Sequence, residues 1–417
     1  MSRLGLLRRA PDYRRLILAT LGSGAGTYLA AIALTVDIWD RTGSGKWVSA
    51  LLIADFLPII LIGLLLGPLV DRFSRRGLLI ASDLSRVFIF AALPFAGSAT
   101  AVVVLAAASG IATGFFRPAV YAGMPNLVSD DDLPNANSLL QAAENLTWMI
   151  GPVIGGALIA AQGPDLAYWL NAVSFLVSIA LLVRIPAQRL QSGAIVSRGH
   201  WQDLGDGFRA VFETRTLVAV LVVWNIVFLG NAAVNVGEVV LAKVSLGAGD
   251  FGFGVLVGMS GLGLTIGSIA ATSLLDRFGT RLGYAGSIAL MGIGFGVAAA
   301  APTLAVAMVG VLVGSVGNGI AVVCNALLVQ RGAPDELRGR VFTVIMSSNY
   351  TAFGLGMVAA GPLVDEFGAR WLWAGATVAF LLGAAIAAVL TRGVDVTPAA
   401  AEVELDVPAT STGLMRS

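Results

Sequence analysis

The feature that most constrains this chain is a series of twelve apolar runs. A helix needs about 20 apolar residues to cross a bilayer. Of the 417 residues, 57% are hydrophobic and only 12% are charged, too few to cover a soluble protein of this size. The continuous runs exclude a single-anchor protein and also a β-barrel, whose strands alternate. The runs cover about 16–36, 47–69, 78–98, 101–123, 138–161, 166–184, 216–241, 251–274, 282–301, 303–329, 341–363 and 370–391.

The loops between the runs differ sharply in positive charge. If the amino terminus is cytoplasmic, the inner side holds 22 of the 26 lysines and arginines, with Arg86 among them, and the outer side holds 4. Loops that stay in the cytoplasm are enriched in these residues. We therefore expect a multi-pass protein with both termini in the cytoplasm.

The chain also carries an internal repeat. Leu69–Arg75 after the second run resembles Leu274–Thr280 after the eighth, and the two aspartates are offset by 205 residues. Parallel duplication in transporters places the substrate site between the halves, near mid-membrane. We predict an all-α membrane protein with twelve transmembrane helices in two six-helix bundles related by pseudo-twofold symmetry. The expected divisions are an N-terminal bundle at 1–185, a cytoplasmic linker at 186–213, a C-terminal bundle at 214–394 and a disordered cytoplasmic tail at 395–417.

The polar linker contains one amphipathic stretch. Trp201, Leu204, Phe208 and Phe212 recur at helical spacing among charged residues. We expect this helix to lie on the inner membrane surface.

Several function classes lack support in the sequence. The net charge of +1 gives no indication of a nucleic-acid partner, and the lone Cys324 forms neither an intrachain disulfide nor a metal cluster. His200 lies in a polar stretch, far in sequence from any apolar segment that could shelter a catalytic triad. The glycines at 43–47 lack the spacing of a phosphate-binding loop. We expect no enzyme, cofactor or metal site, so energy must come from an ion gradient, a substrate gradient or a partner.

The loop after the second run gathers several charges beside a glycine. An acid at this helix end can meet the positive amino-terminal dipole of a neighbouring helix, and arginines are attracted to the anionic inner surface. A simple positively charged turn is the alternative. The residues concerned are Gly67, Asp71, Arg72, Arg75 and Arg76, with Asp276 and Arg277 at the matching positions of the second copy.

This loop resembles the signature loop of the major facilitator superfamily, glycine-x-leucine-x-aspartate-arginine-x-glycine-arginine followed by arginine or lysine. Ser74 stands where the later glycine is usual, and Thr272 replaces the first glycine in the second copy. In that family the loop latches the cytoplasmic side when the cavity opens outward. The resemblance therefore implies a cytoplasmic gate at Gly67, Asp71, Arg72, Arg75 and Arg76, with Asp276 and Arg277 from the second copy. The resemblance implies a secondary transporter whose two halves rock about a central cavity.

The fifth run contains Gly151 and Pro152, followed by Gly155 and Gly156. Proline bends a helix and frees a carbonyl, and glycines allow close helix packing. The segment is similar to an element of superfamily exporters that exchange substrate for protons, although Thr147 replaces an earlier glycine. General small-residue packing remains the alternative.

The segment 114–139 is similar to a bacterial exporter branch that includes macrolide-efflux and enterobactin-exporter-like proteins. The resemblance spans nearly the whole chain and implies proton-coupled export from the bacterial inner membrane. Many drug antiporters carry an arginine early in the fourth helix, where this chain has apolar residues from Ala101 to Leu105. The proton relay of that arginine is therefore not carried over.

Charged groups inside a membrane are costly and are functional candidates. Asp55 and Glu144 lie deep within apolar runs, and Arg117 is the expected partner of Glu144. Acids that face an aqueous cavity can bind and release protons, so we predict proton coupling at these three residues. A static structural pair is the alternative for Glu144. Asp37 and Glu238 lie at outer helix ends, where we expect them at the membrane interface.

Amides and indoles within the runs can orient an amphiphilic ligand in an apolar cavity, or they can simply join helices. We predict proton-driven export of a drug or siderophore-like metabolite by a monomer. An uptake symporter or facilitator for a polar nutrient is one alternative, a non-transporting membrane sensor is another, and a membrane enzyme is a distant third. The predicted cavity residues are Gln141, Asn145, Trp148, Trp224, Asn225, Asn231, Asn235 and Asn349.

Overall fold

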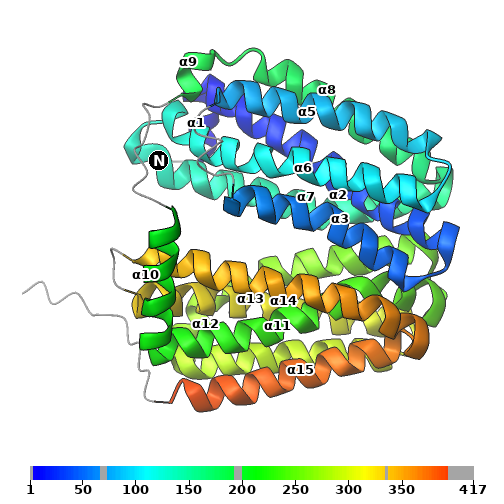
Figure 1. Cartoon of the computed structure of the whole chain (residues 1–417), viewed down its shortest axis with the longest axis vertical. Helices are drawn as coiled ribbons and strands as arrows, with labels where there is room; N and C mark the ends of the chain where they lie inside the picture. The colour runs from blue at the N-terminus through cyan, green and yellow to red at the C-terminus, as the bar shows by residue number, and fades with distance from the viewer. Residues whose placement is uncertain (1–2, 66–72, 192–199, 334–336, 393–417) are drawn as a thin grey trace, which may run out of the picture.

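The computed structural model describes residues 3–65, 73–191, 200–333 and 337–392, and every regular element within these ranges is a helix. Two bundles lie one above the other in Figure 1. The predicted tail and the predicted gate residues Gly67, Asp71 and Arg72 lie outside the described residues.

The N-terminal bundle contains six long helices that follow a short helix, α1 (Arg3–Arg9). Short 3-10 turns, η1 (Leu93–Phe95), η2 (Met124–Leu127) and η3 (Asp130–Asp132), lie between them. The long helices are α2 (Pro11–Thr42), α3 (Gly45–Leu65), α5 (Arg75–Ala92), α6 (Ala99–Gly123), α7 (Leu133–Gln162) and α8 (Pro164–Leu182).

The C-terminal bundle has six spans in five continuous helices. Helix α12 (Gly249–Ala300) is 52 residues long and is interrupted at Gly279, whose φ of 75° divides it into two spans. Ten described helices are long and apolar enough to cross a membrane, and the second span of α12 together with the 30-residue α7 brings the total to twelve. The others are α11 (Arg215–Val240), which continues into a π-helix, η4 (Leu241–Ser245), and α13 (Leu304–Gly332), α14 (Arg338–Phe367) and α15 (Ala369–Leu390).

The two halves have the same kinds of helix cap and turn at equivalent positions. Ser98 caps α6 by accepting a hydrogen bond from Ala101 N, and Thr303 caps α13 in the same way. Gly163 and Gly368 each take a positive φ, 76° and 80°, at the next turn, a conformation that glycine adopts without strain. Both pairs are 205 residues apart, the same offset as the repeated loop.

The linker forms α9 (Ala187–Leu190) and α10 (His200–Glu213), and α10 runs across the ends of the other helices in Figure 1. It packs against α11 and α14, and its Ala210 and Val211 are buried. Phe208 and Phe212 are exposed and stack on each other with centroids 6.4 Å apart. The predicted helix is therefore present, and its contact with lipid remains a prediction. We call this end of the molecule the linker end and the opposite end the distal end.

The two halves meet towards the distal end, where the bundles converge in Figure 1. Lys243 of η4 forms an ion pair with Asp40 of α2. The rings of Phe56 and Phe353 meet edge to face at 6.1 Å. Within the described ranges, these contacts and the bonds of Asp365 discussed below are the hydrogen bonds, ion pairs and ring contacts that we find between the halves.

One charge lies elsewhere than the sequence predicted. Arg86 was assigned to the cytoplasmic side, but it lies within α5 and is only 3% exposed. Eleven residues separate it from the start of that helix, which is about 16 Å along the axis. Arg86 can lie this deep because Asp83, one turn earlier, neutralises it.

Candidate functional site

The ion pair predicted between α6 and α7 is present. Arg117 Nη2 donates to Glu144 Oε2 at 3.0 Å, and Tyr121 Oη donates to the same oxygen at 3.3 Å. The side chains are not sealed, because Arg117 is 57% exposed and Glu144 is 18% exposed. Thr147 fixes the next turn of α7 by donating to the Glu144 carbonyl at 2.8 Å. The Glu144 carboxylate is therefore held in place by its partners while it stays partly accessible to solvent.

Asp55 of α3 is half-buried, and within the described part of the chain its carboxylate has no hydrogen bond or ion pair. Gly110 allows α6 to pack directly against the backbone carbonyl of Asp55. Tyr28 of α2 lies within electrostatic range of Asp55, Glu144 and Arg117. Side chains from four helices thus form one polar cluster inside an otherwise apolar bundle.

An aromatic group lies on the facing half. Phe228 of α11 contacts Trp224, Tyr350 and Phe353 edge to face, with centroids 5.8 to 5.9 Å apart. Phe353 also meets Phe56 of α3, one residue after Asp55. Apolar rings therefore come near the carboxylate cluster from the other bundle. This combination suits a ligand that has both an apolar body and a polar group.

The predicted amides of α7 remain accessible. Gln141 donates to Asn145 at 3.0 Å, one turn apart, and Gln141 is exposed. Trp148 is half-buried. Gln141, Asn145 and Trp148 are spaced four and three residues apart on the helix that carries Glu144, so they can contribute to one face.

The predicted amides of the C-terminal bundle divide into two groups. Asn225 joins α11 to α14, because its Oδ1 accepts from Ser348 Oγ at 3.1 Å. Asn235 is exposed and donates to the Asn231 carbonyl at 2.9 Å. Trp224 and Asn349 are only 3% and 0% exposed, and their place in a substrate cavity stays a prediction. Neither presents a surface to a ligand in this conformation, because both are packed within the bundle.

The predicted gate arginines bind within their own half. Arg75 donates from Nη1 to the carbonyls of Ala122 and Leu190, at 2.9 and 3.0 Å. Arg76 donates to the Val183 carbonyl at 2.8 Å. They fasten the start of α5 to neighbouring helix ends. A role as a gate between the halves is therefore not visible in this conformation.

The other described residues of the repeated loop are Ser74 in the first copy and Asp276 and Arg277 in the second. Ser74, which replaces the usual glycine, caps α5 by accepting from Gly77 N at 3.3 Å. Asp276 and Arg277 are both exposed, and the Arg277 guanidinium lies 5.4 Å from the centroid of the Phe278 ring.

The glycines of the predicted exporter element face two partners. A methyl group on Gly155 would lie 2.8 Å from the Leu29 carbonyl of α2. One on Gly156 would lie 2.8 Å from the Asp250 carbonyl and 2.9 Å from Gly254 Cα, both in α12 of the other half. Gly151 also packs against α2, and Pro152 is buried. The element therefore lies where α7 touches both its own bundle and the opposite one.

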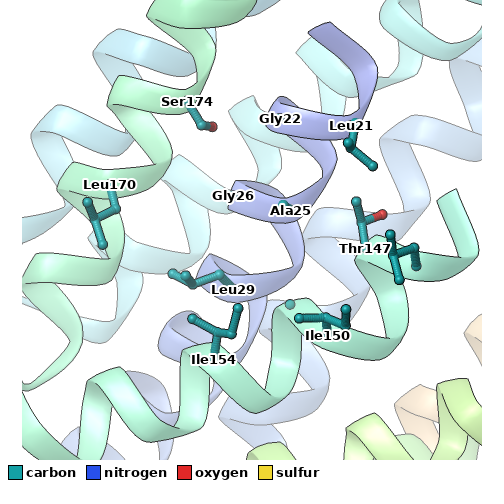
Figure 2. A pocket seen from close by; sticks show the side chains of 12 residues that line it. Leu21, Gly22, Ala25, Gly26, Leu29, Thr147, Ile150, Ile154, Leu170 and Ser174 are labelled. Atoms are coloured by element: carbon teal, nitrogen blue, oxygen red, sulfur yellow. The ribbon is translucent and has the colours of Figure 1, made fainter. Parts of the chain in front are cut away.

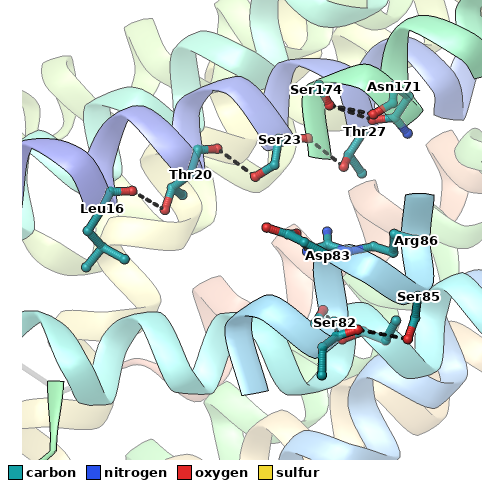
Figure 3. Close-up of polar contacts among 12 residues, drawn as sticks. Leu16, Thr20, Ser23, Thr27, Ser82, Asp83, Ser85, Arg86, Asn171 and Ser174 are labelled. Atoms are coloured by element: carbon teal, nitrogen blue, oxygen red, sulfur yellow. Dashed lines mark hydrogen bonds and ion pairs between the residues drawn. The ribbon is translucent and has the colours of Figure 1, made fainter. Parts of the chain in front are cut away.

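Sequence reasoning missed a second ion pair, which Figure 3 shows between Asp83 and Arg86. Both side chains are buried, and the guanidinium lies 4.6 and 4.3 Å from the ring centroids of Phe116 and Phe175. Two opposite charges one helical turn apart inside an apolar run were the signal for this pair. Tyr28 and Tyr121 were also missed, because a tyrosine in an apolar run gives no sign of its partners.

A groove of about 390 Å³ lies between α2, α7 and α8 (Figure 2). Its walls are formed by aliphatic side chains such as Leu29, Ile150 and Ile154, and Thr147 and Ser174 supply its hydroxyls. Glu144 and Asp55 do not line it. The groove is thus separate from the carboxylate cluster.

Comparison with known proteins gives a consistent result. A family model described as transmembrane secretion effector, within the major facilitator superfamily, matches residues 5–408. The chain belongs to this family. It is therefore a multi-pass membrane transporter, as the loop after α3 suggested from sequence.

Two relatives and one solved structure illustrate the match. The chain is 28% identical to the multidrug efflux pump Tap of Mycolicibacterium fortuitum over 394 residues, which is 90% of this chain and 95% of Tap. It is 24% identical to the putative bacilysin exporter BacE of Bacillus subtilis, covering 68% and 72% of the two chains. A bacterial homologue of the iron transporter ferroportin in an inward-facing state has the same fold, with a TM-score of 0.75 and 18% identity over 94% of this chain and all of that one.

Proposed function

We propose that this protein exports amphiphilic small molecules in exchange for protons, by alternating access between two faces of the membrane. The names of relatives such as Tap support export. The predominance of positive charge at the linker end supports a cytoplasmic position for that end and for both termini.

The observation that carries the proposal is the accessible Arg117–Glu144 pair between α6 and α7. A carboxylate inside a membrane is expensive unless it is paired or hydrated, and this one is both paired and partly exposed. Protonation of Glu144 would remove its attraction for Arg117. Substrate and proton can therefore compete for the same group, which is the requirement for exchange.

Asp55 supplies a second group that can bind a proton. It lies ten residues into α3, about 15 Å from the distal end of that helix. Asp55 and Glu144 both lie near Tyr28 of α2, so the two acids border the same part of the bundle.

The test uses inverted membrane vesicles with an acidic interior and the fluorescent amphiphilic cation ethidium. The wild-type protein should accumulate dye, and collapse of the proton gradient should release it. Glu144→Gln and Asp55→Asn should each lower the initial rate at least tenfold, because a neutral amide cannot exchange a proton. Asp131→Asn, which alters an exposed carboxylate outside the bundle helices, should transport at the wild-type rate.

Two results would contradict the proposal. Proton-driven transport that survives in the Glu144→Gln and Asp55→Asn double variant would remove both acids from the mechanism. Accumulation of a sugar or carboxylic acid in counterflow, without any movement of dye or of other amphiphiles, would favour the uptake alternative.

A further inference from the structure

Helix α3 begins at the distal end without a cap from its own chain segment. Its first backbone N–H groups, those of Gly45 and Lys46, are instead bound by the carboxylate of Asp365, at 2.5 and 3.3 Å. Ser44, which precedes the helix, donates its hydroxyl to the same carboxylate at 2.8 Å. A negative group is stabilised at this position, because free N–H groups and the helix dipole both favour it. Asp365 belongs to α14, so the cap comes from the opposite half.

Two glycines bring the carboxylate within reach. A methyl group on Gly361 of α14 would lie 2.9 Å from the Gly45 carbonyl, 2.9 Å from Lys46 Cα and 2.6 Å from Ser49 Oγ. A methyl group on Gly45 would lie 3.1 Å from the Gly361 carbonyl. The backbones of α3 and α14 therefore touch directly, and any larger side chain would push them apart.

We propose that Asp365 is the residue that holds the distal end closed, by capping α3 from across the interface. The bonds form only while the two halves touch at this end. When the halves separate there, the first turn of α3 loses its cap and the carboxylate loses three donors. The cap thus stabilises the distally closed conformation relative to the distally open one.

The sequence around Asp365 supports a dedicated role. Residues 361–367 read Gly-Pro-Leu-Val-Asp-Glu-Phe and match residues 67–73 at six of seven positions, with glutamate in place of arginine. The proposed role belongs to the segment 361–367 and does not extend to the matching segment 67–73.

The proposal rests on alternating access, so its test measures conformation and not transport. Spin labels are placed at Gly97 and Pro302, exposed distal positions in opposite halves, after Cys324→Ala removes the single cysteine. Pulsed electron paramagnetic resonance then gives the distal distance distribution of the full-length protein. Asp365→Asn should raise the ratio of the long distance to the short one about tenfold, because charge-assisted hydrogen bonds are lost. Gly361→Ala should shift the ratio the same way without altering any charge.

Matched controls lie on the same helix. Glu366→Gln removes the adjacent exposed carboxylate, which has no hydrogen bond or ion pair among the described residues. Gly354→Ala adds a methyl group that meets nothing within 4 Å. Both should leave the ratio within about twofold of the wild type, since neither touches α3.

The possible outcomes distinguish a failure of the Asp365 cap from a failure of alternating access. An unchanged ratio in both Asp365→Asn and Gly361→Ala would overturn the role of Asp365, whatever the wild type does. A wild-type protein that stays at the short distance across pH and with ethidium would count against alternating access. If the long distal distance then appears only in Asp365→Asn and Gly361→Ala, the role of Asp365 in holding the distal end closed would still be supported.

Discussion

Two of the ion pairs in the N-terminal bundle have similar composition and opposite accessibility. Asp83 and Arg86 lie on one helix, and their side chains are 0% and 4% exposed between two aromatic rings. Arg117 and Glu144 join two helices and remain partly exposed. The first pair cannot exchange protons with water without breaking the packing around it, whereas the second can. Solvent access to the charged groups, and not the presence of charge alone, distinguishes a structural ion pair from a candidate functional one.

The largest effect is expected from Arg86→Met. The substitution leaves the Asp83 carboxylate buried with no counter-ion, which costs about 3–5 kcal/mol of stability. Thermal unfolding of the purified protein in detergent measures the loss. Asp83→Leu combined with Arg86→Met should recover most of it, because a well-packed apolar pair avoids the desolvation cost. Wild-type stability in the single variant would show that the pair is not sealed.

The same substitution at the other pair should cost far less. Arg117→Met leaves Glu144 partly exposed and still bonded to Tyr121, so we expect a loss of less than about 1 kcal/mol. Dye transport should nevertheless fall severalfold, because the cation that competes with the proton is gone. If Arg117→Met destabilised the protein as strongly as Arg86→Met, the distinction between the pairs would fail.

The smallest effect is expected from Tyr121→Phe, which removes one hydrogen bond of 3.3 Å to Glu144. Stability should change by about 0.5–1 kcal/mol at most, since water can replace the hydroxyl. The pH profile of dye transport should shift while the maximal rate stays within about twofold. Tyr13→Phe is the matched control: the Tyr13 hydroxyl donates to the Ala136 carbonyl, about two turns of α7 from Glu144, and the substitution should leave the profile unchanged.

Much of the architecture could be predicted from the sequence. The twelve spans, the duplication at an offset of 205 residues and the linker helix all follow from periodic hydrophobicity and repeated short segments. The Arg117–Glu144 pair was also predictable, because the chain order places the end of α6 beside the start of α7. Arg86 was misplaced, because counting charges by loop cannot distinguish a cytoplasmic arginine from one that is neutralised inside a bundle.

The sequence by itself determined how many helices cross the bilayer and which end of them carries positive charge, because these depend on local composition and on repetition along the chain. Only the tertiary structure decided which polar groups are sealed and which remain open, and which residues meet across the two halves. Asp365 and Gly45 are 320 residues apart, and their contact exists only because two backbones approach through glycine. Burial and long-range contact are set by the packing of all helices together, and no short segment encodes them.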